Sequence, residues 1–482
     1  MKKKFFSNLI LLVSLNLVIK PFWIFGIDRT VQNVTGADAY GFYFSLLSFS
    51  LLLNILLDGG TTNYNNRVIS REPDKLSDWF SQLFLIRLLL AVVYSIAAVT
   101  LAVILGYSHR QFHLLGFLIL NQFLASMILF FRSNITALQH FRIDSMLSVA
   151  DRVLMILFVG VVLWGHVTDE PFRIEWYVYL QSVAYGIVAV MAFVLVYVRT
   201  QFFRPRFHRE FFFRIIRESF PFAMLSLLMA LYYRVDSVML ERMLPDGARQ
   251  AGIYAQAFRL LDAFVMYAYL FSVILLPLFS RMLKEGKAVD GLVGFAFLLL
   301  MIPVLILSLT TVIFRVPVME LLYLKHTAVS ADVLGILMVA LIFVSSGYLF
   351  GTLLTARGDI KHLSRLAAGG FLLNILLNFL LIPRFQTLGA AWASLVTQAG
   401  IAVIQIIMVG RRFHIPVNRM IPWRTYLFFG LILLTGLILF RSGMNPLTGF
   451  AVQFCVSLVL ALLIRLIPLK QMITILISEE DE

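Results

Sequence analysis

The sequence predicts an all-α polytopic membrane protein. Of its 482 residues, 60% are hydrophobic and only 14% are charged, and the mean hydropathy is +0.90. A water-soluble fold of this composition would expose far more apolar surface than it could bury. Because a transmembrane helix needs roughly 20 apolar residues, the chain has room for about fourteen of them.

Apolar segments of this length alternate with short polar connections along the whole chain. The first follows Met1-Lys-Lys-Lys and has no small-residue cleavage site, so we expect a retained helix rather than a signal peptide. The predicted spans are 8–27, 39–57, 79–105, 112–131, 145–165, 176–198, 219–241, 252–279, 291–314, 330–356, 363–382, 388–409, 424–441 and 446–468.

The distribution of basic residues predicts the orientation of these spans. Cytoplasmic loops carry an excess of Lys and Arg, and an inside N-terminus places most of the 40 such residues on the cytoplasmic side. With an even number of helices, both termini are then cytoplasmic. The most basic connection lies between spans six and seven, where the segment from Phe211 to Arg217 has the pattern of an interfacial amphipathic helix.

This basic connection suggests a division of the chain into two six-helix lobes. We predict an N-terminal lobe at 1–199, a linker at 200–218, a C-terminal lobe at 219–412, and two further helices with an acidic tail at 413–482. The lobes show a weak internal sequence repeat: span two begins with Ala39-Tyr-Gly-Phe-Tyr43, and span eight begins with Ala251-Gly-Ile-Tyr254. Corresponding helices point the same way, which is typical of a parallel repeat. The alternative is ordinary interfacial turn chemistry with an aromatic anchor.

Six charged side chains lie inside the predicted spans. An ionised group at bilayer depth costs roughly 2.5 to 3.5 kcal/mol, and such groups usually face a bundle interior or an aqueous cavity. They therefore indicate a polar cavity between helices. The six residues are Lys20, Arg87, Arg234, Asp236, Arg259 and Asp262.

Two of the six charges have no acidic partner within a helical turn. Lys20 lies near the middle of span one, one turn after Asn16, and Arg87 lies about a third of the way into span three. Both are candidates for binding an anion, and snorkelling to the interface is the alternative. Snorkelling is also our interpretation of Arg152, while Asp58 is expected to be an interfacial or capping carboxylate.

The other four charges fall at one level, in the outer halves of spans seven and eight. Arg259 and Asp262 are three residues apart and share a helical face, whereas Arg234 and Asp236 point to different faces. These groups form either a binding site or structural ion pairs that hold the second half together.

Motifs for enzymatic chemistry are absent from the sequence. There is no phosphate-binding Gly-rich loop, no His-Glu-x-x-His and no cysteine pair, since Cys455 is the single cysteine. We therefore expect no cofactor, no metal and no nucleic-acid partner. The short connections also argue against a catalytic domain outside the membrane, which favours a transporter or flippase over an enzyme.

Several short motifs follow one another from span one to span twelve. They are Asp28-Arg29, Thr35-Gly-Ala-Asp-Ala-Tyr-Gly41, Leu57-Asp-Gly-Gly60, Glu218-Ser-Phe-Pro-Phe222, Arg234-Val-Asp-Ser-Val-Met239, Gly252-Ile-Tyr-Ala-Gln-Ala-Phe-Arg259, Leu354-Thr-Ala-Arg-Gly-Asp359 and Leu388-Gly-Ala-Ala-Trp-Ala393. No single motif is diagnostic, but their order and spacing are specific. In these motifs the chain resembles the lipid-linked oligosaccharide flippases of the multidrug/oligosaccharidyl-lipid/polysaccharide exporter superfamily.

The resemblance implies two lobes around a central cationic cavity that alternates between inward- and outward-facing states. The expected substrate is a polyprenyl-diphosphate-linked glycan, moved across the bacterial cytoplasmic (inner) membrane for O-antigen or polysaccharide export. Coupling to H+ or Na+ and contacts with polysaccharide assembly proteins are also expected. We expect the diphosphate or glycan to bind basic residues of the cavity, and acidic residues to balance charge or bind the coupling ion. The basic set is Lys20, Arg29, Arg87, Arg234 and Arg259, and the acidic set is Asp236 and Asp262.

Two alternative functions remain at this point. A multidrug or cation antiporter of the same superfamily would share the architecture but would need acids in its cavity, and the six charges comprise four bases and two acids. A membrane-embedded glycan polymerase or ligase would need a large folded outer loop, which the sequence does not predict.

Overall fold

The computed structural model describes residues 15–466 apart from residues 17, 63, 64, 66–68, 70, 71, 73, 75, 166, 168 and 205–208. The described chain is helical, which confirms the predicted all-α class. Its elements are η1 (a π-helix, Trp23–Asp28), α2 (Arg29–Leu52), α3 (Ile55–Asp58), α5 (Leu76–Ile104), α6 (His109–Ala137), α7 (Phe141–Trp164), α8 (Ile174–Tyr197), α9 (Arg209–Met243), α10 (Gly247–Lys284), α11 (Asp290–Ile313), α12 (Arg315–Leu322), α13 (Thr327–Arg357), α14 (Ile360–Phe413), α15 (Val417–Met420), α16 (Trp423–Arg441) and α17 (Pro446–Leu463).

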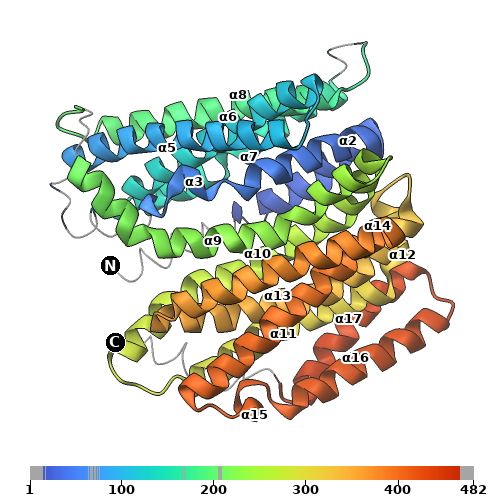
Figure 1. The fold of residues 1–482 in the computed structure, drawn as a ribbon. Coiled ribbons are helices and arrows are strands. Elements are labelled where there is room, and N and C mark those ends of the chain that lie inside the picture. Colours follow the sequence, from blue (N-terminus) through green and yellow to red (C-terminus); the bar gives the residue numbers. More distant parts are fainter. Residues whose placement is uncertain are drawn as a thin grey trace. The chain divides into compact units, whose positions relative to one another are not determined.

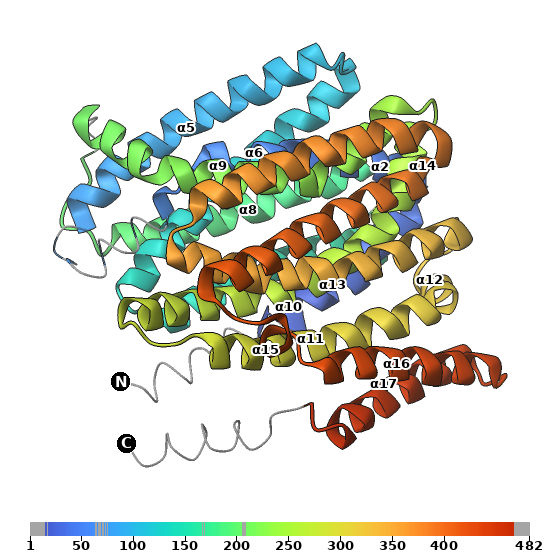
Figure 2. The ribbon, with the colours of Figure 1, turned by 60° about the horizontal axis from the view of Figure 1, so that its bottom comes forward.

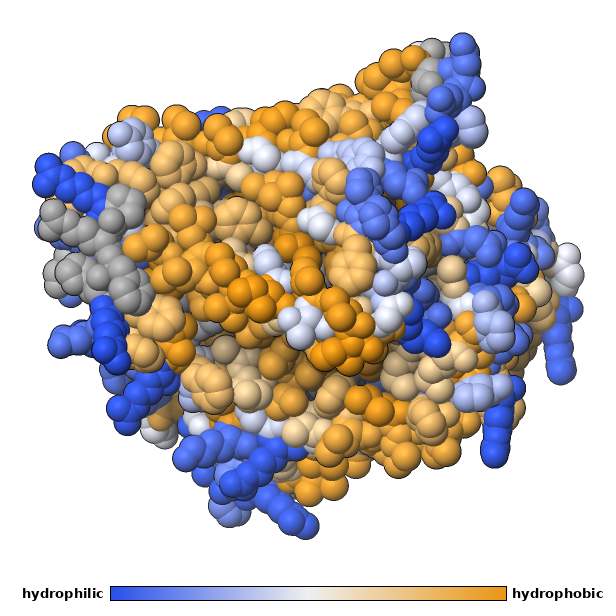
Figure 3. Space-filling view, turned by 45° about the horizontal axis from the view of Figure 1, so that its top comes forward, coloured by the Kyte–Doolittle hydropathy of each residue, from blue (hydrophilic) through white to orange (hydrophobic). Residues whose placement is uncertain are grey.

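The length and composition of these helices make the chain a multi-pass membrane protein. Within the described residues, eleven helices are long and apolar enough to cross a membrane. One of them, α14, has 54 residues and contains two predicted spans, which meet at Gln386 (φ 51°, ψ −127°). On the face drawn in Figure 3, hydrophobic side chains cover the middle stretches of the helices and hydrophilic ones gather toward their ends. The count of fourteen spans and the side of both termini stay predictions, and most of span 8–27 lies outside the described residues.

The chain forms two compact units, Met1–Ala255 and Gln256–Glu482, and α10 runs from one into the other. In the first unit, α5, α6, α7 and α8 lie side by side (Figure 1). Their shared core is rich in phenylalanine: Phe80 stacks on Phe130 with ring centroids 5.6 Å apart, and Phe131 packs against both rings. Burial of such rings stabilises the packing of these helices. The two-lobe division at 200–218 stays a prediction.

The linker between α8 and α9 is anchored on the first unit. The backbone N–H of Gln201 donates to the hydroxyl of Ser77 (2.9 Å), and that of Arg204 donates to the hydroxyl of Ser81 (3.1 Å). Both serines belong to the first two turns of α5. The predicted interfacial amphipathic helix is not a separate element, because Phe211 to Arg217 form the first turns of α9, a continuous helix of 35 residues.

The two helices that carry the repeated motifs cross one another within the first unit. The chain turns sharply at Gly36 (φ 80°, ψ 170°), and the part of α2 after this turn packs against the start of α10. A Cβ atom at Gly41 would lie 1.8 Å from the carbonyl oxygen of Ala248, and one at Gly252 would lie 2.0 Å from the carbonyl oxygen of Ala37. Each helix therefore contributes a pair of small residues four apart, which lets the two backbones touch.

In the second unit, α11 and α13 pack together and α14 packs against α13. The last two helices, α16 and α17, form an antiparallel hairpin that lies against α11 (Figure 2). Ile432 and Phe428 of α16 are buried against Leu305 of α11 in this contact. The connection after α11, predicted as a loop, contains the eight-residue helix α12.

Candidate functional site

A polar group lies midway along the helices of the first unit, around Lys20. The side-chain amide of Asn16 donates to the hydroxyl of Ser148 on α7 (3.1 Å), which places the first span against α7. One turn further on each helix, Lys20 interacts electrostatically with Arg152 and Asp151. The expectation that Lys20 faces a polar interior agrees with this arrangement, and its role in binding substrate stays a proposal.

Arg152 is the residue that sequence reasoning missed. Its Nη1 donates to the hydroxyl of Tyr185 (2.8 Å), and its guanidinium lies over the rings of Trp23 (5.4 Å) and Tyr185 (5.8 Å). The predicted snorkelling of Arg152 is wrong, because α7 starts at Phe141 and Arg152 falls midway along its 24 residues. The hydroxyl of Tyr185 and the rings of Tyr185 and Trp23 hold the Arg152 guanidinium rigidly at the level of Lys20.

Asp28, at the end of the π-helix η1 that follows Lys20, is a buried carboxylate. Asp28 ends η1 and is only 2% exposed, and its two oxygens accept hydrogen bonds from Tyr40 (2.7 Å) and Tyr177 (2.6 Å). Tyr177 also stacks on Trp23, with ring centroids 5.8 Å apart. Isolated π-helical turns are frequent at functional sites. The ladder of polar groups thus runs from Asn16 through Lys20 to Asp28.

Arg132 and Asp144 form an ion pair at the Asn16 end of the ladder. Arg132, near the end of α6, donates through Nε to Asp144 in the first turn of α7 (2.7 Å). Arg132 also interacts electrostatically with Lys20. Within the described residues, the ladder carries three basic groups. Arg132 is bonded to Asp144, Arg152 pairs with Asp151 at 3.7 Å, and Lys20 interacts with the same Asp151.

Arg87 lies elsewhere, in a closed ion pair. Its guanidinium is bonded to Asp58 and Thr62, donates to the hydroxyl of Ser126 (2.8 Å) and lies over the ring of Phe130 (5.1 Å). Arg87 has no acidic partner on its own helix, but α3 folds back beside α5 and brings Asp58 to it, so the expected need for an external anion is met within the protein. Only 1% of the Arg87 side chain is exposed, so this network fits a structural role.

Asp58 also caps the chain turn that follows it, as expected. Its oxygens accept hydrogen bonds from the backbone N–H groups of Gly60 (3.0 Å) and Thr62 (3.1 Å). Arg29, at the start of α2, is partly exposed, and within the described part of the chain its buried Nε meets no hydrogen-bond acceptor. The structure does not bring Arg29 into the Arg87 network.

The four charges of α9 and α10 are divided between the two units. In the first unit, Asp236 is 1% exposed and accepts a hydrogen bond from Tyr254 (3.0 Å), and the guanidinium of Arg234 lies over the ring of Tyr233 (5.2 Å). Arg259 and Asp262 belong to the second unit, where both are partly exposed. Both predicted roles of these four residues, binding substrate and forming structural ion pairs, stay predictions.

The second unit holds buried polar side chains on α14 that were not predicted as site residues. Asn378 donates to the side-chain oxygen of Asn374 (3.0 Å), and both side chains are fully buried on α14. Thr397, in the later part of α14, is also buried, and among the described residues its hydroxyl and the Asn374 amide nitrogen keep unused hydrogen-bonding capacity. Two asparagines one turn apart in an apolar span were the available signal.

A bundle of apolar helices with ionic groups midway along them defines a multi-pass membrane protein with a polar interior. The chain belongs to the polysaccharide biosynthesis protein family, whose pattern matches residues 8–283. No curated protein matches the sequence.

Solved structures of transporters and flippases share the fold. A lipid II flippase, MurJ, in an inward closed conformation has a TM-score of 0.72 at 16% identity, with 95% of this chain and 99% of that chain covered. An inward-facing multidrug resistance MATE family transporter of the MOP superfamily has a TM-score of 0.65 at 13% identity, with 81% and 94% covered. A MOP superfamily transporter from Pyrococcus furiosus has a TM-score of 0.56 at 12% identity, with 85% and 94% covered. The chain thus has the MOP fold, as the resemblance implied.

Proposed function

We propose that the protein is a flippase that moves a polyprenyl-diphosphate-linked oligosaccharide across the bacterial cytoplasmic membrane by alternating access. The family and the fold support a transporter of lipid-linked glycans. The observation that carries the proposal is the pair formed by Lys20 and Arg152, two cations held near one another midway along the helices of the first unit. Their substrate would be an anion.

The charge balance of this pair favours a phosphate-bearing headgroup. Two like charges in a low-dielectric setting repel strongly, and Asp151, which pairs with Arg152 at 3.7 Å and also interacts with Lys20, offsets one of the two positive charges. A diphosphate would supply the missing negative charge and accept hydrogen bonds from both cations. Because Tyr185 and Trp23 already fix Arg152, little side-chain entropy would be lost on binding.

The remaining basic residues are not equally good candidates for binding the substrate. Arg29, Arg234 and Arg259 stay candidates for contacts with the diphosphate or glycan. Arg87 is the weakest candidate, since its guanidinium is enclosed by Asp58, Thr62 and Ser126. We therefore place Arg152 beside Lys20 at the head of the list.

Coupling to an ion gradient is part of the proposal, and two groups of residues are candidates. Asp236, a buried carboxylate with a tyrosine donor, can exchange a proton or bind Na+. The hydrogen-bonded pair Asn374 and Asn378 offers neutral oxygens, which suit Na+ but not a proton. Asp236→Asn and Asn374→Ala, made as separate variants, distinguish the two sites. Loss of gradient dependence in Asn374→Ala would indicate Na+ at the asparagines, and loss in Asp236→Asn would indicate an ion at the carboxylate. Asp262 stays a further candidate for charge balance.

A cation or drug antiporter is the second candidate function. It is favoured by Asp28, a carboxylate buried among Tyr40, Tyr177 and nearby aromatic rings, which is the chemistry that attracts an organic cation. A membrane-embedded polymerase or ligase has no comparable support, so we propose that the chain is not an enzyme.

The deciding experiment uses purified protein in proteoliposomes that contain polyprenyl diphosphate N-acetylglucosamine. Transfer to the outer leaflet is followed by lectin accessibility. We expect Lys20→Ala and Arg152→Ala to reduce transfer strongly at unchanged protein amount, and Arg173→Ala, which removes an exposed arginine paired with Glu170, to leave it intact. Normal transfer by both cavity variants would refute the cationic site. Drug-stimulated proton flux without glycan-lipid transfer would establish the antiporter.

A further inference from the structure

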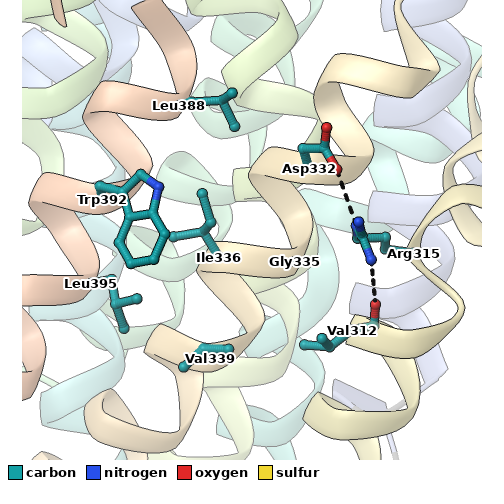
Figure 4. A pocket seen from close by; sticks show the side chains of 9 residues that line it. All are labelled: Val312, Arg315, Asp332, Gly335, Ile336, Val339, Leu388, Trp392 and Leu395. Carbon is teal, nitrogen blue, oxygen red and sulfur yellow. Dashed lines mark hydrogen bonds and ion pairs between the residues drawn. The ribbon is translucent and has the colours of Figure 1, made fainter. Parts of the chain in front are cut away.

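A lateral cavity on the second unit is lined by none of the charged residues of the candidate site. It has a volume of about 450 Å³, within the usual range of small-molecule sites, and is lined by side chains from the end of α11, the start of α12, α13 and the later part of α14. Figure 4 shows that the lining is divided: an arginine and an aspartate lie at one side, and apolar side chains form the rest.

The polar side is an ion pair with unused hydrogen-bonding capacity. Nε of Arg315 donates to Asp332 (3.2 Å), and its Nη1 donates to the backbone carbonyl of Val312 (3.3 Å). A guanidinium has five N–H donors, so further donors remain. Arg315 and Asp332 are 40% and 53% exposed, respectively, and both remain accessible to a ligand.

The position of Arg315 is fixed by the backbone beside it. A Cβ atom at Gly335 would lie 2.9 Å from Cδ of Arg315, so the glycine makes room for the aliphatic part of the arginine side chain. Arg315 follows the end of α11 and Asp332 lies in the second turn of α13. Charges at the ends of membrane-spanning helices lie near the membrane surface, at the level of lipid headgroups.

The apolar side follows the helices away from this charged end. Ile336 and Val339 lie one and two turns beyond Asp332 on α13, and Trp392 and Leu395 lie opposite them on α14 (Figure 4). Trp392 is 49% exposed, as expected of an aromatic side chain that anchors a helix at the membrane interface. The cavity thus has a charged end at headgroup level and an apolar wall that follows the hydrocarbon.

We infer that this cavity binds one zwitterionic phospholipid with a primary amine, such as phosphatidylethanolamine. The lipid phosphate lies against Arg315, its ammonium group against Asp332, and one acyl chain along Ile336, Val339 and Trp392. An anionic lipid gains the same contact with Arg315 but meets the carboxylate of Asp332. A choline headgroup has no N–H to donate to that carboxylate. The ion pair therefore selects by matching both charges of the ligand.

The test is native mass spectrometry of the delipidated, full-length protein with phosphatidylethanolamine, phosphatidylglycerol and phosphatidylcholine offered at equal concentration. We expect one phosphatidylethanolamine to remain bound at the highest activation energy. Arg315→Ala and Asp332→Asn should each weaken it about tenfold, the value of one charge-assisted contact. Arg281→Ala is the matched control, since it breaks an exposed pair with Glu285 outside this cavity.

A second measurement guards against variants that lose their fold. The thermal unfolding midpoint in detergent should rise with added phosphatidylethanolamine for the unaltered protein and for Arg281→Ala, but not for Asp332→Asn. Equal retention of all three lipids, preference for phosphatidylglycerol, or retention by Arg315→Ala and Asp332→Asn would overturn the assignment. Displacement of the lipid by a polyprenyl phosphate would overturn it as well.

Discussion

Arg87 on α5 and Asp58 on α3 form an ion pair in which 1% of the arginine and 26% of the aspartate side chain is exposed. Two further hydroxyl groups and an aromatic ring surround the guanidinium. Burial of one charge against one counter-charge makes the pair sensitive to the loss of either partner.

Asp58→Asn should destabilise the protein by about 3 kcal/mol or more, because the buried Arg87 then lacks a counter-charge. The double variant Asp58→Asn with Arg87→Met should be less damaging than the sum of the two single variants. Unfolding midpoints in detergent provide the measurement. An Asp38→Asn variant, which breaks an exposed pair with Arg249, serves as the control and should change little. A wild-type midpoint for Asp58→Asn would show that the pair is dispensable.

Tyr185→Phe should weaken binding of polyprenyl diphosphate by roughly tenfold. The substitution keeps the ring beside Arg152 but removes a hydrogen bond to a charged group, worth about 1.5 to 3 kcal/mol. Tyr197→Phe, near the end of the same helix, is the matched control. This prediction depends on the proposed function. Unchanged binding with Tyr185→Phe would mean that Arg152 does not need to be held in place.

Gly41→Ala should destabilise the protein by about 1 to 3 kcal/mol through overpacking, since its new methyl group would meet the Ala248 carbonyl. Gly252→Ala should behave alike because the contact is reciprocal. Gly116→Ala on α6, where no atom lies within 4 Å of the added Cβ, is the control and should be neutral or stabilising. If all three variants had the same unfolding midpoint as the unaltered protein, close approach of α2 and α10 would not be needed for stability.

Ser77→Ala with Ser81→Ala should release the linker between α8 and α9. The backbone N–H groups of Gln201 and Arg204 then lose their acceptors, and trypsin should cleave after Arg199 faster than in the unaltered protein. Limited proteolysis in detergent measures the rate. Ser182→Ala is the control, because that hydroxyl bonds only within its own helix according to the described contacts. Equal cleavage rates would show that the linker is held by its side chains alone.

Hydropathy alone was sufficient to predict the helical membrane class, because apolar length is a local property of the sequence. It did not predict helix ends well: starting span five at 145 instead of Phe141 made Arg152 look shallow. The break at Gln386 falls in the connection predicted between spans 363–382 and 388–409, whereas the short helix α12 was out of reach because it lies in a segment predicted as a loop.

Partners of buried charges were less predictable than the charges themselves. Asp58 is 29 residues from Arg87, and only the fold of α3 against α5 brings the two together. In contrast, the sequence repeat between Ala39-Tyr-Gly and Ala251-Gly-Ile reflected a true spatial contact, since the helices that carry the two motifs cross at Gly41 and Gly252. Lys20 was expected from the sequence to face a polar interior, but its neighbour Arg152 came only from the structure.

The reciprocity at Gly41 and Gly252 has a consequence for the origin of the chain. Ala37 with Gly41 and Ala248 with Gly252 are equally spaced, and each glycine contacts the alanine of the other pair. This is the pattern of an isologous interface, in which two identical subunits exchange the same contacts. The parallel repeat predicted from the sequence implies a half-length ancestor with one copy of the motif, which would have formed a homodimer through this surface. Gene duplication and fusion would then preserve inside one chain a contact that first joined two.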